Sequence, residues 1–220
     1  MKVVKAKNKN STGFISGNEG FTLIEMAIVL IIIGIIIGAV VKGKDLIRGA
    51  EQKKVYSKFV NEWRTAYMNF YDRTGKILGD TSNPLDGETD GATCTQLVDG
   101  DPGSPPAFYG LSQIGLNPPV TNSTDACIYR YTDSEGGSHD VTVTFDYGTD
   151  TATRSSYNYL HLKNLPLELA IALDRMIDGE ADGTKGDFVR VNGTALLDWI
   201  RTSSEGPTSE TQVARWKMEF

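Results

Sequence analysis

The sequence has few residues of the kinds that usually carry out catalysis or bind metals. Its 220 residues include two histidines and two cysteines. His139 and His161 lie far apart in the chain, and neither belongs to a cluster with metal-ligand spacing. No glycine-rich phosphate loop, nucleophile elbow or zinc-type cysteine pattern is visible. The sequence therefore predicts a protein that is not an enzyme.

Basic residues are also in deficit, with 22 lysines and arginines against 28 aspartates and glutamates. The first 20 residues hold four of the lysines and one of the glutamates, which leaves 18 basic and 27 acidic side chains in the rest of the chain. General DNA binding depends on cations that neutralise phosphates. The charge balance therefore argues against a nucleic-acid partner.

Proline is absent between Phe21 and Asn83, which allows a long helix without a break. The stretch from Phe21 to Val41 is a run of 21 residues with a single charge, Glu25. At about 1.5 Å per residue, a helix of this length spans about 30 Å and matches the hydrocarbon core of a bilayer. Residues 21–41 are therefore predicted to form a transmembrane helix.

A helical pattern continues beyond the apolar run. Large apolar side chains recur at spacings of four, four, four and three residues, which places them on one face of a helix. They are Val55, Phe59, Trp63, Tyr67 and Phe70. The pattern stops near Gly75, a residue type that commonly ends helices. Residues 42–75 are thus predicted to be the amphipathic half of one helix of about 50 residues.

Two features point beyond a plain membrane anchor. A carboxylate inside an apolar helix, such as that of Glu25, costs roughly a few kcal/mol in a bilayer unless it is paired, so such residues are usually functional. An ordinary secretory signal has its cleavage site after the apolar region, whereas the small residue Gly20 stands before it. The leader before the run is basic, with Lys2, Lys5, Lys7 and Lys9. Cleavage between Gly20 and Phe21 would remove residues 1–20 and keep the helix.

The segment Gly20-Phe21-Thr22-Leu23-Ile24-Glu25 resembles the type IV prepilin signature, which type IV pilins share with the pseudopilins of type II secretion. The resemblance implies that a prepilin peptidase cuts after Gly20 on the cytoplasmic side and methylates the new amine of Phe21. It also implies a single-pass subunit of the bacterial inner membrane with its head outside the cytoplasm. An inner-membrane assembly platform would then insert the subunit into a helical filament of like or related subunits. Many pilins have a proline where the helix leaves its membrane half, and this chain has none.

In such a filament, Glu25 is predicted to neutralise the Phe21 amine of a neighbouring subunit. Each charge is costly alone in an apolar core, so the pair would set the axial register even if it adds little net stability. Gly34 and Gly38 form a small-xxx-small pair that would let helices approach closely. The alternative for these glycines is that membrane helices simply tolerate them.

Residues 76–220 are predicted to form a globular head. Turn-forming residues dominate from Lys76 to about Ser123, with short helical turns at 95–98 and 108–114. A helix is predicted at 165–177, with Pro166 at its first position. Alternating and β-branched patterns predict strands at 127–131, 141–147, 157–162, 188–191 and 214–220. The fold class is therefore α+β and pilin-like: a long N-terminal helix packed on an antiparallel sheet, with an extra helix in the C-terminal part of the head.

Cys94 and Cys127 lie in the part of the chain that the resemblance places outside the cytoplasm. An oxidising compartment favours a disulfide between them, and two free thiols are the alternative. Many pilins close a C-terminal loop with their disulfide, whereas this one would lie in the middle of the chain.

One acidic segment is a candidate cation site. Asp178, Glu180 and Asp182 alternate and are followed by Gly183, which resembles the start of an EF-hand calcium loop. The match is incomplete, because Val189 occupies the place of the closing glutamate, for which Asp187 could compensate. The segment thus predicts either a calcium site formed by Asp178, Glu180, Asp182 and Asp187 or an acidic, glycine-rich connection. No cofactor is required by the rest of the sequence.

The function that these patterns favour is that of a structural subunit, major or minor, of a type IV pilus. A pseudopilin of a type II secretion system, which would form a periplasmic pseudopilus, is the close alternative. A third hypothesis is a binding or enzymatic domain that uses its helix only as a membrane anchor. Glu25 and the Gly20/Phe21 site argue against this third hypothesis.

Overall fold

The computed structural model describes residues 20–82, 85–101, 103, 109–149, 155–192, 195–199 and 211–218. The chain divides into two compact units, residues 1–45 and residues 46–220. The elements are α1 (Leu23–Val55), η1 (Tyr56–Val60), α2 (Asn61–Thr74), α3 (Cys94–Asp99), η2 (Ser112–Ile114), β1 (Ile128–Thr132), β2 (Ser138–Thr149), β3 (Ser156–Pro166), α4 (Leu167–Ile177), β4 (Phe188–Asn192), β5 (Ala195–Leu197) and β6 (Thr211–Lys217).

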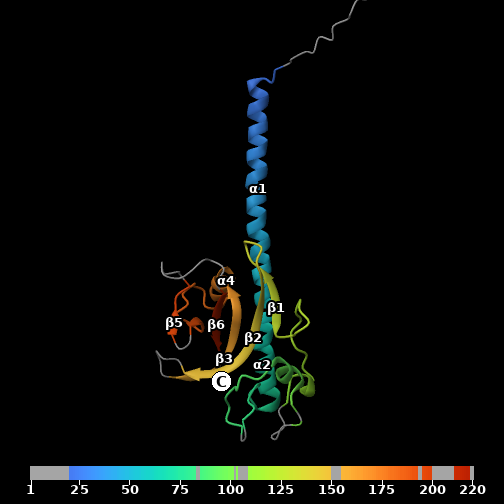
Figure 1. Ribbon diagram of the computed structural model, residues 1–220, viewed down its shortest axis with the longest axis vertical. Coiled ribbons are helices and arrows are strands. Elements are labelled where there is room, and N and C mark those ends of the chain that lie inside the picture. The colour runs from blue at the N-terminus through green and yellow to red at the C-terminus, as the bar shows by residue number, and fades with distance from the viewer. Residues whose placement is uncertain are drawn as a thin grey trace, which may run out of the picture. The chain divides into compact units, whose positions relative to one another are not determined.

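The predicted long helix is confirmed. It runs from Leu23 to Thr74, a length of 52 residues, as α1, η1 and α2 in succession (Figure 1). The helix ends at Gly75, which has a positive φ of 66° and donates its N–H to the carbonyl of Tyr71 at 2.7 Å. This left-handed conformation suits glycine because it has no Cβ.

The part of α1 in the first unit is apolar and exposed. Every residue from Leu23 to Val41 has its side chain open to the surroundings, with Leu23 itself 92% exposed. This helix is long and apolar enough to cross a membrane, and no other helix of the described residues is. Exposed apolar surfaces of this size are typical of sites that contact a membrane or another protein.

Within the helix, η1 is a π-helical turn at the point where the apolar stripe becomes buried. A four-residue repeat runs ahead of an α-helix of 3.6 residues per turn by about 40° at each step. The wider π-helical turn takes up part of this drift. As a result, all members of the predicted stripe stay on the buried face, and none is more than 1% exposed: Val55, Phe59, Trp63, Tyr67 and Phe70.

The strands form one six-stranded sheet in the order β1-β2-β3-β6-β4-β5, with every neighbouring pair antiparallel (Figure 1). β1 and β2 form a hairpin, in whose turn Asp133 donates its N–H to the carbonyl of Gly137 at 2.8 Å. The last strand, β6, lies in the middle of the sheet, where Trp216 pairs with Leu160 of β3 and Phe188 of β4. Its predicted end, Phe220, lies outside the described residues.

The helix stripe packs on the inner face of this sheet. Tyr67 stacks on Phe145 with ring centroids 5.0 Å apart, and Trp63 meets the same ring edge-on at 6.0 Å. The indole N–H of Trp63 donates to the carbonyl of Ala126 at 3.1 Å, so this polar group is satisfied inside the core. The result is the predicted α+β arrangement, with the helix of residues 46–74 as its main packing partner.

The extra helix of the head is also confirmed, as α4. It follows β3 directly and contacts β3, β4 and β6. Pro166 is the N-cap residue, one position before its predicted place, because its ψ of 142° is still extended. α4 buries Leu169, Ala170, Leu173 and Asp174, so its inner face carries one acidic residue among apolar ones.

Candidate functional site

The first candidate site is the start of α1. Gly20 and Phe21 precede the helix in an exposed, non-helical segment, and the helix begins at Leu23. Glu25 accepts hydrogen bonds from the backbone N–H of Thr22 at 2.8 Å and from its hydroxyl at 2.7 Å. The N–H of Glu25 donates to the hydroxyl oxygen of Thr22 at 3.3 Å. Thr22 and Glu25 thus form a reciprocal capping box.

The capping box gives Glu25 a second role that the sequence analysis did not assign. The Thr22-x-x-Glu25 pattern was visible in the sequence as a capping signature, and Thr22 is the residue that was missed. The carboxylate is held over the helix N-terminus, where the partial positive charge of the helix favours it. Glu25 lies three residues after Thr22 and four residues after Phe21, which is the residue that follows the predicted cut.

The surface that follows the capping box has no partner within the described chain. An added Cβ at Gly34 or Gly38 would meet no atom within 4 Å. The exposed side chains around them are aliphatic and belong to residues such as Ile33, Ile35 and Ile37. This part of α1 therefore has a continuous apolar surface, in which Gly34 and Gly38 are two positions without a side chain. Such a surface suits contact with lipid or with other apolar helices.

The predicted disulfide between Cys94 and Cys127 is confirmed, with a Cα–Cα distance of 5.8 Å. Cys94 is the first residue of α3, and Cys127 immediately precedes β1. The capping box of α3 is formed by Thr93 and Gln96, so both ends of the bond are attached to regular structure. The bond fixes the loop-rich part of the head to the edge of the sheet.

The four residues of the predicted calcium loop do not converge on one point. Asp178 accepts the backbone N–H groups of Asp187 and Phe188 at 3.2 and 2.9 Å. Asp182 accepts a hydrogen bond from the Lys185 ammonium at 2.6 Å, which is the main reason that its pKa is lowered to about 2. Glu180 is exposed.

Among the described residues, the one acidic or sulfur group compact enough for a single ion is Cys94, Asp125 and Cys127, and its two cysteines form the disulfide. Calcium binding stays a prediction from the sequence pattern.

Asp174 is a buried ionisable residue that sequence reasoning missed. Its side chain is fully buried, and one carboxylate oxygen accepts hydrogen bonds from the indole N–H of Trp199 and, at 2.9 Å, from the N–H of Asp182. The other oxygen has no hydrogen-bond partner among the described residues. Burial, and to a smaller extent the neighbouring Asp178, raises the pKa of Asp174 to about 6.

Replacing Asp174 by asparagine should stabilise the head at neutral pH. Because the folded-state pKa lies above the unfolded value, the ionised form is disfavoured by folding, and stability falls as the pH rises from about 4 to about 6. An asparagine keeps an oxygen for Trp199 and Asp182 and turns an N–H toward Asp178. We expect a gain of about 2 kcal/mol in the free energy of unfolding above pH 6, which disappears near pH 4.

This gain is measured by denaturant unfolding of wild type and variant across pH 4–8. The exposed residue Glu180 provides the control, because Glu180→Gln removes a charge from the same loop without changing a buried group. A D174N variant that is less stable than wild type at every pH would contradict the assignment.

A groove in the head lies between the long helix and the segment 116–122, with a volume of about 580 Å³. Its floor is mostly apolar and includes Ala66, Leu116, Pro119 and Tyr129. Lys54 and Lys58 line the part of it toward the start of the helix, and both are exposed.

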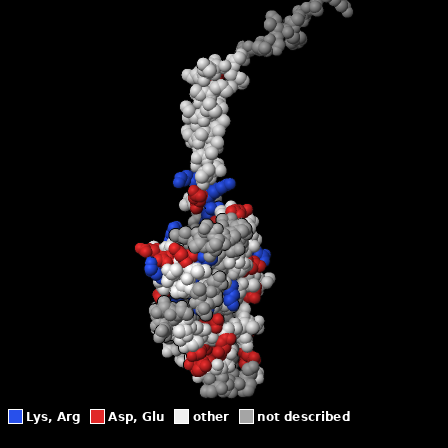
Figure 2. All heavy atoms as spheres, turned by 60° about the vertical axis from the view of Figure 1, so that its left-hand side comes forward, with Lys and Arg blue, Asp and Glu red and all other residues white. Residues whose placement is uncertain are grey.

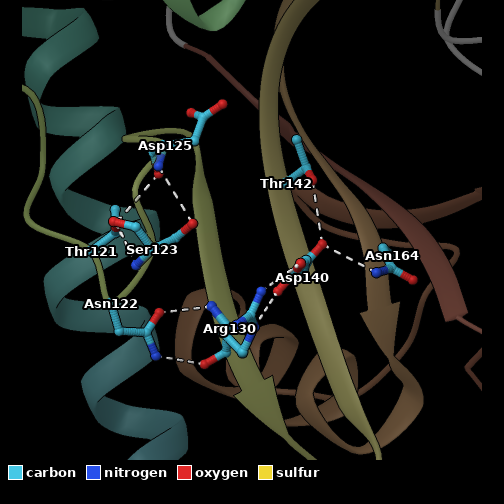
Figure 3. A network of polar contacts seen from close by, with 8 residues as sticks. All are labelled: Thr121, Asn122, Ser123, Asp125, Arg130, Asp140, Thr142 and Asn164. Carbon is cyan, nitrogen blue, oxygen red and sulfur yellow. Dashed lines mark hydrogen bonds and ion pairs between the residues drawn. The ribbon is translucent and has the colours of Figure 1, made fainter.

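Polar contacts hold the wall of the groove against β1 (Figure 3). The side-chain amide of Asn122 accepts the N–H of Arg130 at 2.8 Å and donates to the carbonyl of the same residue at 2.7 Å. The Arg130 guanidinium donates twice to Asp140, at 2.7 and 3.1 Å, and this hydrogen bond lowers the pKa of Asp140. These contacts attach the Asn122 end of the wall to β1.

Comparison with known families places a signature on the N-terminal part of the chain. Residues 15–41 match the prokaryotic N-terminal methylation motif, the signature of type IV pilins and pseudopilins. The matched segment includes Gly20, Phe21, Glu25 and the whole apolar run from Phe21 to Val41. The comparisons with curated proteins and with solved structures found no match.

Proposed function

We propose that this chain, whose N-terminal segment carries the signature of type IV pilins and pseudopilins, is a structural subunit, major or minor, of a type IV pilus. The observation that carries the proposal is the methylation motif on an apolar, exposed helix that continues into the packed core of a head. A prepilin peptidase would hydrolyse the bond between Gly20 and Phe21 and methylate the new amine. The exposed helix would then be the surface through which subunits polymerise.

Glu25 is proposed to act during assembly. In a filament the apolar surface of α1 would be covered by other helices, which removes water from the carboxylate. A neighbouring Phe21 amine would then supply the opposite charge, since an unpaired charge is costly in such a place. Subunits out of register would leave Glu25 unpaired, so the pair selects one axial offset.

The proposed location follows from the same features. The apolar helix supports a single-pass anchor in the inner membrane, and the Cys94–Cys127 bond supports a head in an oxidising compartment outside the cytoplasm. The partners would be the prepilin peptidase, the inner-membrane assembly platform and other pilin-type subunits. No nucleic-acid partner is proposed, because the chain is acidic.

A pseudopilin of a type II secretion system is the second candidate, because the methylation motif is common to both groups. The chain would then be cut and methylated in the same way but would polymerise into a short filament in the periplasm. Processing alone does not separate the two candidates, so an experiment must also record where the processed subunit is found.

Mass spectrometry of filaments sheared from cells tests the proposal. We expect an N-terminal peptide that begins with methylated Phe21. Abundant protein in the sheared fraction identifies a principal pilus subunit. Processed protein that stays with the cells or appears only in traces identifies a minor pilin or a pseudopilin. A chain that still begins at Met1 would overturn the proposal, and a Gly20→Leu variant provides the uncut control.

A further inference from the structure

We propose that the groove between the long helix and segment 116–122 receives the acidic loop 85–90 of a second copy of this chain. This inference rests on the proposed function, because it takes the subunits to pack with parallel helices in a filament. It identifies the two surfaces of the head that would meet there.

The groove combines an apolar floor with a positive end. Ala66, Leu116, Pro119 and Tyr129 provide apolar surface. Lys54 and Lys58 project from the helix at one end, and Glu62, one turn further along the helix, also lines the groove. No ion pair joins either lysine to a carboxylate among the residues that the structure describes. A partner that fits must therefore present an apolar side chain next to negative charges.

The loop after the helix presents this combination. Leu85 is a large apolar residue that is 36% exposed, Asp86 next to it is exposed, and Glu88 is half-buried. Figure 2 shows acidic side chains gathered at the lower end of the head, the end at which α2 terminates in Figure 1. The loop thus carries negative charges, opposite in sign to those of Lys54 and Lys58.

Internal hydrogen bonds hold the loop in one shape. The buried carboxylate of Asp80 accepts the N–H of Gly87 at 2.9 Å. Asn158, on β3, accepts the N–H of Thr89 at 3.0 Å and donates to the carbonyl of Gly87 at 3.0 Å. A loop that is already ordered loses little conformational entropy on binding.

The loop cannot reach the two lysines of its own subunit. Leu85 and Gly87 lie next to Tyr71 and Gly75 at the end of α2. Lys54 is 17 residues before Tyr71, which corresponds to about 25 Å along a helix. A second copy with a parallel helix, displaced by about 25 Å, would bring its loop to the lysines. The two surfaces differ, so the contact is head-to-tail and repeats without closing, as a filament requires.

Charge reversal tests the contact. We expect Lys54→Glu with Lys58→Glu to reduce the filament yield at least tenfold, and Asp86→Lys with Glu88→Lys to do the same. A chain with all four changes should recover to within threefold of wild type, because the attraction is restored with the signs exchanged. Lys163→Glu changes an exposed lysine of β3 and should leave the yield unchanged. Thermal unfolding of each full-length variant in detergent checks that the head still folds.

Cross-linking provides the second measurement. Native Cys94 and Cys127 are joined to each other, so added cysteines react separately. A chain with Lys58→Cys and Asp86→Cys should form disulfide-linked ladders of subunits in oxidised filaments, whereas Lys163→Cys with Asp86→Cys should not. The inference would be overturned if the lysine reversal and the acidic reversal each gave wild-type filament yield. It would also be overturned if the Lys58→Cys chain formed a disulfide with a protein of another mass. Methylated wild-type filaments would leave the proposed function intact in that case.

Discussion

Filament yield should fall below a tenth of the wild-type value when Glu25 is replaced by glutamine. Glutamine at this position keeps an oxygen that can accept the N–H and hydroxyl of Thr22, so the capping box is preserved. The change therefore removes the charge alone. Removing one partner of a buried ion pair costs about 3–5 kcal/mol, which is more than a tenfold effect at each subunit contact. Sheared-filament yield and the N-terminal mass are the measurements.

The matched control separates the charge from the cap. Thr22→Ala removes the capping hydroxyl and costs about 1 kcal/mol of local helix stability but leaves the carboxylate in place. We expect this variant to assemble within threefold of wild type and to be methylated at Phe21. If Thr22→Ala abolished assembly while Glu25→Gln assembled normally, the role of Glu25 would be capping rather than pairing. The Glu25→Gln chain should itself be cut and methylated.

The helix was predictable because its signal is local and long. The stripe from Val55 to Phe70 predicts one buried helix face without any knowledge of the rest of the head. The apolar run before it predicts a helix segment that the head does not cover. The π-helical turn at Tyr56–Val60 could be inferred only in outline from the spacing of four. It depends on how the stripe meets Phe145 and Tyr129, which lie far away in the sequence.

The strands were predicted by their alternation, but their order in the sheet was not. The position of β6 between β3 and β4 depends on pairing of Trp216 with residues from two distant segments. β5 has three residues, too few for an alternating pattern. The sequence thus contained the elements and lacked local information on how they pair.

Thr22 and Asp174 were not predicted as site residues, for different reasons. Thr22 belongs to a local pattern, Thr-x-x-Glu, which had been assigned to a filament role through Glu25 alone. Asp174 has no local signal, because its burial depends on Trp199 and Asp182, which follow in the chain. An aspartate beside Leu173 in an amphipathic helix is indistinguishable in sequence from one on the solvent face.

The second large effect is expected when the disulfide between Cys94 and Cys127 is removed. Cys94→Ser with Cys127→Ser should reduce the free energy of unfolding of the head by about 3–4 kcal/mol, because the unfolded chain regains the freedom of the loop between them. The two cysteines are 33 positions apart. The loop also loses its attachment beside Ala126, whose carbonyl accepts the indole N–H of Trp63 in the core. Denaturant unfolding of the detergent-solubilised protein measures the change.

Reduction provides the control for this variant, because wild type in excess dithiothreitol should unfold at the same denaturant concentration as the double serine protein. Oxidised wild type should unfold at a clearly higher concentration. Reduced wild type and the double serine variant lack the same bond, so their near-ultraviolet circular dichroism before unfolding should be the same. A loss of less than 1 kcal/mol would mean that segment 95–126 is held mainly by its other contacts, such as the bonds of Asn122 to Arg130.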